Sequence, residues 1–124
     1  MMKTPMLVSV VDDDESIRES LPDLLKELGF TARTFPSAEE FLGSEAILQT
    51  ACLILDIAMP GMCGPDLQSE LERRRIKVPI IFITAHEDEA VRSRVLEGGA
   101  VDYLLKPFSD VALLNALDAA LERR

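Results

Sequence analysis

Five residues of this sequence could perform chemistry together: Asp12, Asp13, Asp56, Thr84 and Lys106. Carboxylate oxygens are the ligands that Mg²⁺ prefers, and a carboxylate can also attack phosphorus to give an aspartyl phosphate. An ammonium group can neutralise the oxygens of a phosphoryl group during such a transfer, and a hydroxyl group can hydrogen-bond to them. These residue types therefore suit metal-assisted phosphoryl transfer, provided that the fold brings the side chains together.

The charges of this set also favour a cation as a partner. Two carboxylates about 4 Å apart repel each other by roughly 4 kcal/mol at an effective dielectric constant near 20. Each residue also has a structural alternative. An aspartate after a strand often caps a helix, which we expect of Asp14. Thr84 could be an ordinary strand residue and Lys106 a solvated charge. Such roles account for each residue on its own. If the fold brings all five side chains to one edge of a sheet, a shared functional site explains them better.

The remaining sequence predicts the elements that would position these side chains. Apolar segments predict strands at residues 6–11, 31–35, 51–55, 78–83 and 101–105. Apolar residues at helical spacing, with capping residues beside them, predict five helices. The first helix runs from Asp14 through Pro22 to Gly29, and a short second helix starts at Ser37. The third runs from Pro65 to the arginines at 73–75, the fourth covers 87–97, and the fifth starts at Ser109 or Asp110. The last helix is predicted to pack through Val111, Leu114, Leu117 and Leu121.

Five βα units predict an α/β fold with one parallel sheet, right-handed crossovers and helices on both faces. In such sheets, ligands bind beyond the carboxyl ends of the strands. Asp12 and Asp13 follow the first predicted strand, and Asp56 follows the third. Thr84 ends the fourth strand and Lys106 follows the fifth. We therefore expect all five side chains to gather at one edge of the sheet.

The composition excludes several classes of function. The 124 residues, 48% of them hydrophobic, suit one domain with a single core. The net charge of −9 argues against direct binding of nucleic acid. The sequence has neither an apolar run of roughly 20 residues nor a signal-peptide pattern, so we expect a cytoplasmic protein without membrane contact. Cys52 and Cys63 share no ligand spacing with the single histidine, which argues against a zinc site.

Four segments resemble bacterial two-component response-regulator receiver domains, in order and spacing as well as in residues. They are VVDDDESIR (10–18), LILDIAMPGMCG (53–64), IFITAHED (81–88) and GGAVDYLLKPF (98–108). The resemblance covers essentially the whole chain, residues 1–124. It implies a flavodoxin-like doubly wound (βα)5 fold with strand order 2-1-3-4-5. It also implies a signalling switch, not an enzyme with a separate substrate, which catalyses only its own phosphorylation and dephosphorylation.

The resemblance implies a role for each residue of the acidic set. Asp56 would be the phosphoacceptor, and the phosphoryl group would come from a sensor histidine kinase or a phosphotransfer protein. Asp13, Asp56 and the backbone carbonyl of Ala58 would bind Mg²⁺, or Mn²⁺ in its place. Asp12 would bind the metal mainly through a water molecule. Lys106 would pair with the phosphoryl group.

The resemblance also implies how the signal would leave the site. Thr84 would hydrogen-bond a phosphoryl oxygen and shift inward, and the rotamer of Tyr103 would follow that shift. The face made by helix 87–97, strand 101–105 and the last helix would then change, and two copies of the chain could dimerise through it. Pro107 would follow a cis peptide bond. His86 stands two residues past Thr84, where we expect a solvent-facing loop residue rather than a contact to the phosphoryl group.

Three alternatives remain beside this interpretation. A haloacid-dehalogenase-type phosphatase would use Asp12 as nucleophile and Asp14 as acid, but it would leave Asp56 without a task. A degenerate receiver would act as a docking module without phosphorylation, against which the complete acidic, threonine and lysine set argues. A flavin-binding module of similar topology would need a phosphate-binding loop rich in Ser, Thr and Gly after the first strand, and this sequence has none there.

Overall fold

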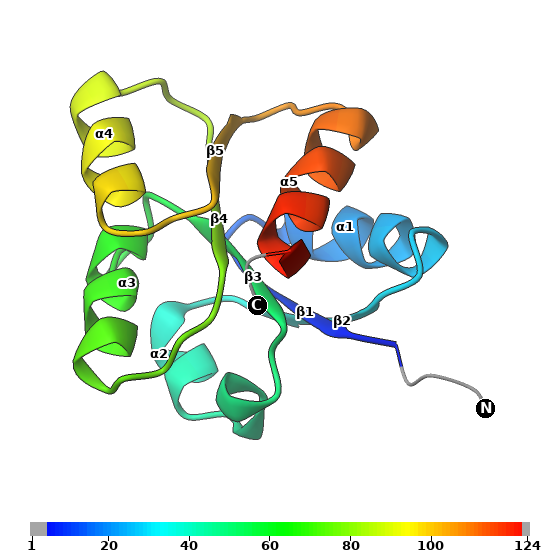
Figure 1. Cartoon of the computed structure of the whole chain (residues 1–124), viewed down its shortest axis with the longest axis horizontal. Coiled ribbons are helices and arrows are strands. Elements are labelled where there is room, and N and C mark those ends of the chain that lie inside the picture. Colours follow the sequence, from blue (N-terminus) through cyan, green and yellow to red (C-terminus); the bar gives the residue numbers. More distant parts are fainter. Residues whose placement is uncertain (1–4, 123–124) are drawn as a thin grey trace.

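Five parallel strands form the sheet of the computed structural model, in the order β2-β1-β3-β4-β5 (Figure 1). They are β1 (Leu7–Val11), β2 (Thr31–Phe35), β3 (Cys52–Asp56), β4 (Ile80–Thr84) and β5 (Asp102–Leu105). Each neighbouring pair is parallel, which confirms the predicted α/β fold and strand order. The structure describes residues 5–122, so the ends of the predicted domain, 1–4 and 123–124, lie outside the described residues.

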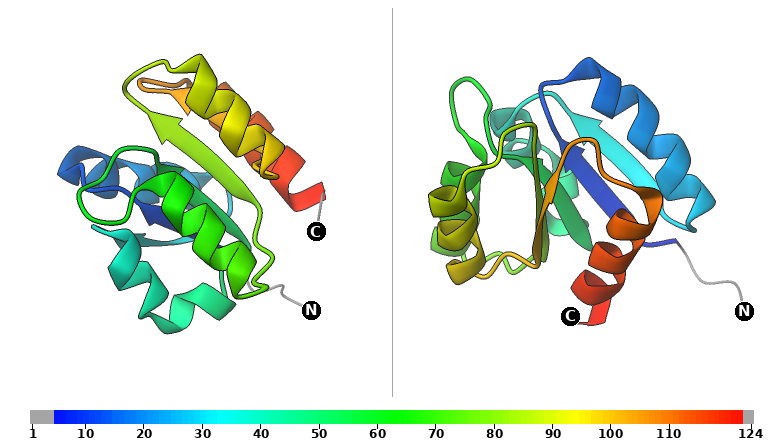
Figure 2. Two further views of the ribbon diagram at one scale, coloured as in Figure 1. Left: turned by 90° about the vertical axis from the view of Figure 1, so that its left-hand side faces the viewer. Right: turned by 90° about the horizontal axis from the view of Figure 1, so that it is seen from above.

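Helices cover both faces of this sheet (Figure 2). Helices α1 and α5 lie on one face, and α2, α3 and α4 lie on the other. Their bounds are α1 (Glu15–Glu27), α2 (Ala38–Leu42), α3 (Gly64–Arg73), α4 (Glu89–Glu97) and α5 (Asp110–Glu122). A short 3-10 helix, Glu45–Leu48, follows α2 and was not predicted. Within residues 5–122, no helix combines the length and the hydropathy that a membrane span requires.

The core has two parts because successive residues of a strand point to opposite faces of the sheet. Leu53 and Leu55 of β3 pack into the cluster on the α2–α3–α4 face. Cys52 and Ile54 of the same strand pack into the cluster on the α1–α5 face. All five residues of β3 and all five of β4 are buried. These strands are therefore fixed from both sides, and so are the residues at their carboxyl ends.

Two sequence predictions require correction. Helix α4 begins at Glu89 and not at residue 87, because the Asp88 carboxylate accepts hydrogen bonds from the amides of Ala90 (3.1 Å) and Val91 (3.2 Å). Helix α5 packs only in part through the predicted stripe, since Leu117 is buried but Val111 is 67% exposed. Its buried residues are Leu113, Ala116, Leu117 and Ala120. Ala116 and Ala120 lie outside the predicted stripe and are nevertheless buried, because small side chains allow a helix to lie close to a sheet.

Three helices end on a residue with left-handed backbone geometry. Gly29 (φ +97°) follows α1 and Gly99 (φ +102°) follows α4, whereas Arg75 (φ +59°) takes this position after α3. The next amide in each case bonds back to the last helical turn, as Ile76 does to the Leu71 carbonyl at 2.9 Å. Glycine suits this geometry, while a residue with a Cβ pays about 1–2 kcal/mol to adopt it. Arg75 is therefore a strained helix end.

We expect Arg75→Gly to raise the free energy of unfolding by about 1 kcal/mol, because the relief of strain exceeds the added entropy of the unfolded chain. Arg75→Ala should bring no such gain, since alanine keeps the Cβ while it removes the charge. Urea unfolding of the three proteins measures the difference. An equal gain in both variants would assign the effect to the arginine charge and contradict the strain.

Candidate functional site

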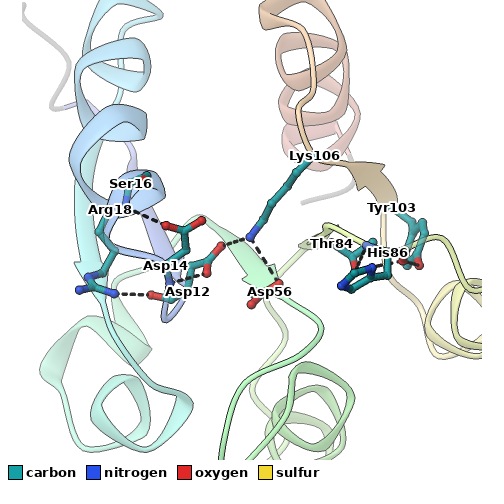
Figure 3. Close-up of polar contacts among 9 residues, drawn as sticks. All are labelled: Asp12, Asp14, Ser16, Arg18, Asp56, Thr84, His86, Tyr103 and Lys106. Carbon is teal, nitrogen blue, oxygen red and sulfur yellow. Dashed lines mark hydrogen bonds and ion pairs between the residues drawn. The ribbon is translucent and has the colours of Figure 1, made fainter.

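The carboxyl ends of four strands bring the predicted site residues to one edge of the sheet (Figure 3). Asp12 directly follows β1, and Asp56 is the last residue of β3. Thr84 ends β4, and Lys106 follows β5 with its amide bonded to the Thr84 carbonyl at 2.8 Å. The edge lies where the connections from β1 and from β3 lead to opposite faces, which is where doubly wound sheets bind ligands.

Three carboxylates form the centre of the site. One oxygen from each of Asp12, Asp13 and Asp56 lies within 4.8 Å of the other two. Asp12 is 0% exposed and Asp56 5% exposed, while Asp13 faces solvent. The donor set consists of oxygen atoms only, and one member opens to water, which suits a hard divalent cation that keeps some of its water. The residues present therefore fit Mg²⁺.

Lys106 is the cation beside this cluster. Its ammonium group donates a hydrogen bond to Asp12 Oδ2 at 2.7 Å and lies 3.6 Å from Asp56 Oδ1. Figure 3 shows the side chain reaching from the β5 end towards both carboxylates. One lysine charge thus faces two buried carboxylates, and the third carboxylate is adjacent. The site keeps a net negative charge that a bound cation would reduce.

Backbone contacts fix the orientation of Asp12. The Asp14 amide donates to Asp12 Oδ1 at 2.9 Å, and the Arg18 guanidinium donates to the Asp12 backbone carbonyl at 2.9 Å. Asp14 in turn caps α1, because its Oδ1 accepts from the Ser16 amide at 2.9 Å. The sequence predicted Asp14 as the helix cap, but it did not predict the hydrogen bond from Arg18 to the Asp12 carbonyl. A guanidinium that binds a backbone carbonyl has no signature in the residue types.

The surroundings shift the pKa of two site residues. Burial, followed by the negative charge of Asp12, raises the pKa of Asp56 from 3.8 to about 7, although Lys106 acts in the opposite direction. Burial opposes the charge on Lys106, but its hydrogen bond to Asp12 and the charges of Asp56 and Asp12 outweigh this and raise its pKa. Lys106 is therefore a permanent cation, and the protonation of Asp56 depends on the burial and the charges around it.

A second group of polar residues lies beside the cluster, at the ends of β4 and β5. The Thr84 hydroxyl donates to the His86 backbone carbonyl at 3.1 Å and accepts from the His86 amide at 3.2 Å. The Tyr103 hydroxyl donates to the same carbonyl at 3.3 Å. Thr84 and Tyr103 are both buried, so one backbone carbonyl joins two enclosed hydroxyl groups. The imidazole of His86 is on an exposed residue, as the sequence predicted.

A family model described as the response regulator receiver domain matches residues 8–118. The chain belongs to the response regulator receiver domain family. Nodulation protein W of Bradyrhizobium diazoefficiens is 48% identical over 120 residues, which cover 97% of this chain and 53% of that protein. The transcriptional regulatory protein FixJ of Azorhizobium caulinodans is 37% identical over 122 residues, 98% of this chain and 58% of that protein. The chain thus spans about half the length of these curated relatives.

Solved structures agree with the fold of this receiver domain. The crystal structure of FixJ-N matches it with a TM-score of 0.88 and 34% identity, over 98% of both chains. The response regulator StyR matches with a TM-score of 0.89 and 43% identity, over 97% of this chain and 61% of the other. The resemblance drawn from the four sequence segments is therefore confirmed at the level of family and fold.

The structure of the receiver domain places the predicted residues in two groups. Asp12, Asp13, Asp56 and Lys106 come together as their places after the strands predict. The hydroxyl groups of the second group bond to the loop after β4, so Thr84 does not hydrogen-bond to Asp56. The role of the carbonyl of Ala58, an exposed residue of the loop after β3, stays a prediction. The Lys106–Pro107 peptide bond is cis, as predicted.

The raised pKa of Asp56 makes the stability of the metal-free receiver domain depend on pH. Because the folded state holds the Asp56 proton up to about pH 7 and the unfolded chain releases it near 3.8, the folded state loses stability between these values as pH rises. Asp56→Asn removes this loss. We expect the variant to gain stability over the wild type from pH 4 to pH 7 and to keep the gain above that.

Chemical unfolding in the presence of EDTA, at several pH values, measures this difference. EDTA removes any divalent cation that would stabilise the ionised carboxylates. Unfolding free energies of the two proteins that run parallel between pH 4 and pH 8 would contradict the pKa of Asp56 and its assigned cause.

Proposed function

We propose that this receiver domain accepts a phosphoryl group on Asp56 from a phosphohistidine of a sensor histidine kinase or phosphotransfer protein. The observation that carries the proposal is the position of Asp56, beside two further carboxylates and 3.6 Å from the Lys106 ammonium. A nucleophile, a cation and an oxygen-rich metal site within one cluster are the parts that phosphoryl transfer needs. Asp12, Asp13, Asp56 and the Ala58 carbonyl would hold Mg²⁺ or Mn²⁺.

In the proposed reaction an Asp56 carboxylate oxygen attacks phosphorus. A phosphorus–oxygen bond forms while the bond from phosphorus to the imidazole nitrogen breaks, and the imidazole leaves with the electron pair and takes up a proton. The metal, when bound, supplies charge neutralisation at the phosphoryl oxygens. Lys106 favours the ionised form of Asp56, against the effects of burial and of Asp12 on its pKa, and is placed to bind a phosphoryl oxygen. Asp12 keeps Lys106 in place through their 2.7 Å hydrogen bond.

The signal would leave through the second polar group. A phosphoryl group on Asp56 offers Thr84 a charged acceptor, which is a stronger hydrogen-bond partner than the neutral His86 carbonyl. A move of Thr84 would free that carbonyl and change its contact with the Tyr103 hydroxyl. Phosphorylation would therefore shift the population of two states of the loop after β4. Exposed Leu105 (41%) and Val111 (67%) support the α4-β5-α5 face as the output and homodimer surface.

The other predicted properties are part of the same proposal. We expect a single receiver domain over residues 1–124, with a cytoplasmic location and no direct contact with nucleic acid or membrane. The phosphatase alternative has lost its support, because its proposed acid, Asp14, caps α1 and bonds to the Ser16 amide. The docking module remains the second candidate, since it would keep the fold and the output face without the chemistry.

Intact-mass spectrometry after incubation with acetyl phosphate tests the proposal. We expect the wild type to gain one phosphoryl group with Mg²⁺ and to gain none with EDTA. Asp56→Asn should gain none in either condition, because the nucleophile is absent, while Asp23→Asn, on the exposed side of α1, should behave as the wild type. An adduct that survives in Asp56→Asn would contradict the acceptor. No adduct in any protein would leave the docking module.

A further inference from the structure

A side chain of helix α2, outside the acidic cluster, bonds to the loop that follows Asp56. The Glu39 carboxylate, in the first turn of α2, accepts a hydrogen bond from the Met62 amide at 3.1 Å. Glu39 and Met62 are 23 residues apart in the sequence. The segment between Asp56 and Met62 contains Ala58, whose carbonyl is the proposed metal ligand. The contact therefore connects α2 with the loop that completes the site.

The base of this loop is already held by its own residues. The Gly64 amide donates to the Ile57 carbonyl at 2.9 Å, and a Cβ on Gly64 would lie 2.3 Å from the Asp56 carbonyl oxygen. The Asp66 carboxylate accepts from the Cys63 amide at 3.4 Å. These contacts close the loop at its two ends. Among residues 5–122, Glu39 is the side chain from outside the 57–66 segment that bonds to the loop, and it does so near the tip.

Gly61 fits the Glu39 carboxylate closely. Its backbone has φ +75°, and a Cβ at this position would lie 2.7 Å from Glu39 Oε2. A side chain at residue 61 would therefore displace the carboxylate as well as strain the backbone. The absence of a Cβ lets the Glu39 carboxylate reach the next amide, that of Met62. The glycine at position 61 and the glutamate at position 39 thus fit each other at this contact.

We propose that Glu39 is a positioning residue of the phosphoacceptor site, which holds the loop after Asp56 in the conformation that presents the Ala58 carbonyl to the metal. The inference rests on the proposed metal site. A backbone carbonyl binds a metal more tightly if the loop carrying it is ordered before the metal binds, since ordering it afterwards costs conformational entropy. Groups that orient metal ligands typically contribute about 10–100-fold to metal affinity.

A carboxylate in the first turn of a helix also stabilises the helix through its dipole. Glu40 separates the two effects, because it lies in the same turn and is exposed, and its carboxylate makes no hydrogen bond or ion pair within the described residues. Glu40→Ala is therefore the matched control for Glu39→Ala. Glu39→Gln is the conservative variant, since its amide oxygen can still accept from Met62 while the charge is absent.

Two measurements test the proposal, and the first needs no metal. Exchange of the Met62 amide proton, followed by NMR in EDTA, should be about 10-fold faster in Glu39→Ala, as expected for loss of a hydrogen bond worth about 1.4 kcal/mol. It should stay near the wild-type rate in Glu39→Gln and Glu40→Ala. Calorimetric titration with Mg²⁺ should then give an affinity about 10-fold weaker in Glu39→Ala, and within about 2-fold of wild type in the other two.

A double-mutant cycle that combines Gly61→Ala with Glu39→Ala tests the positioning role without relying on one variant alone. If the Glu39 carboxylate occupies the space of the new methyl group, Gly61→Ala should weaken Mg²⁺ binding less in the Glu39→Ala background than in the wild type. Additive effects would overturn the match between the two residues. Equal losses of affinity in Glu39→Gln and Glu39→Ala would assign the effect to charge and overturn the positioning role.

The outcomes also separate this inference from the proposed function. Wild-type protein that binds no Mg²⁺ would refute the metal site itself, whatever Glu39 does. Wild-type binding with no change in Glu39→Ala, in either amide exchange or affinity, would refute the positioning role and leave the metal site standing.

Discussion

The burial of two neighbouring carboxylates, Asp12 and Asp56, is the constraint on which the rest of this site depends. The two groups are 0% and 5% exposed, and together with Asp13 they place three oxygens within 4.8 Å of one another. The sheet enforces this arrangement, because β1 and β3 are neighbouring strands covered on both faces. Stability gained from the hydrophobic core therefore maintains an electrostatic conflict at the sheet edge, which Lys106 relieves only in part.

This conflict also gives a physical basis for the proposed switch. In the proposed function a divalent cation would reduce the negative charge of the cluster, whereas a phosphoryl group on Asp56 would add negative charge and new acceptor oxygens. Either change would alter the balance of forces at the ends of four strands. Thr84 and Tyr103 lie at the ends of β4 and β5, and the backbone carbonyl of His86 joins their hydroxyl groups. In the proposed switch, a small displacement there would reach α4 through the loop that connects β4 to α4. The proposed switch would thus convert a change of charge at the sheet edge into a change of packing near α4.

The sequence predicted the parts of this account that depend on residue type and position. Buried strands are continuous apolar runs, and the polar residue that ends each run marks the edge, as Asp56 does after 51–55. It could not predict contacts made to the backbone, which include Arg18 to the Asp12 carbonyl and Glu39 to the Met62 amide. Any residue has these backbone groups, so only the fold reveals which ones are used. The predicted stripe of α5 was right at Leu117 and wrong at Val111, and it omitted Ala116 and Ala120, whose small side chains are buried.

The melting temperature in the presence and absence of Mg²⁺ tests the central claim most directly. A ligand that binds only the folded state stabilises it by about 2.7 kcal/mol at a concentration of 100 Kd. If Asp12, Asp13 and Asp56 form a site whose repulsion the cation relieves, Mg²⁺ should raise the melting temperature of the wild type and have little effect on Asp13→Asn. An equal rise in both proteins, or none in the wild type, would contradict the account.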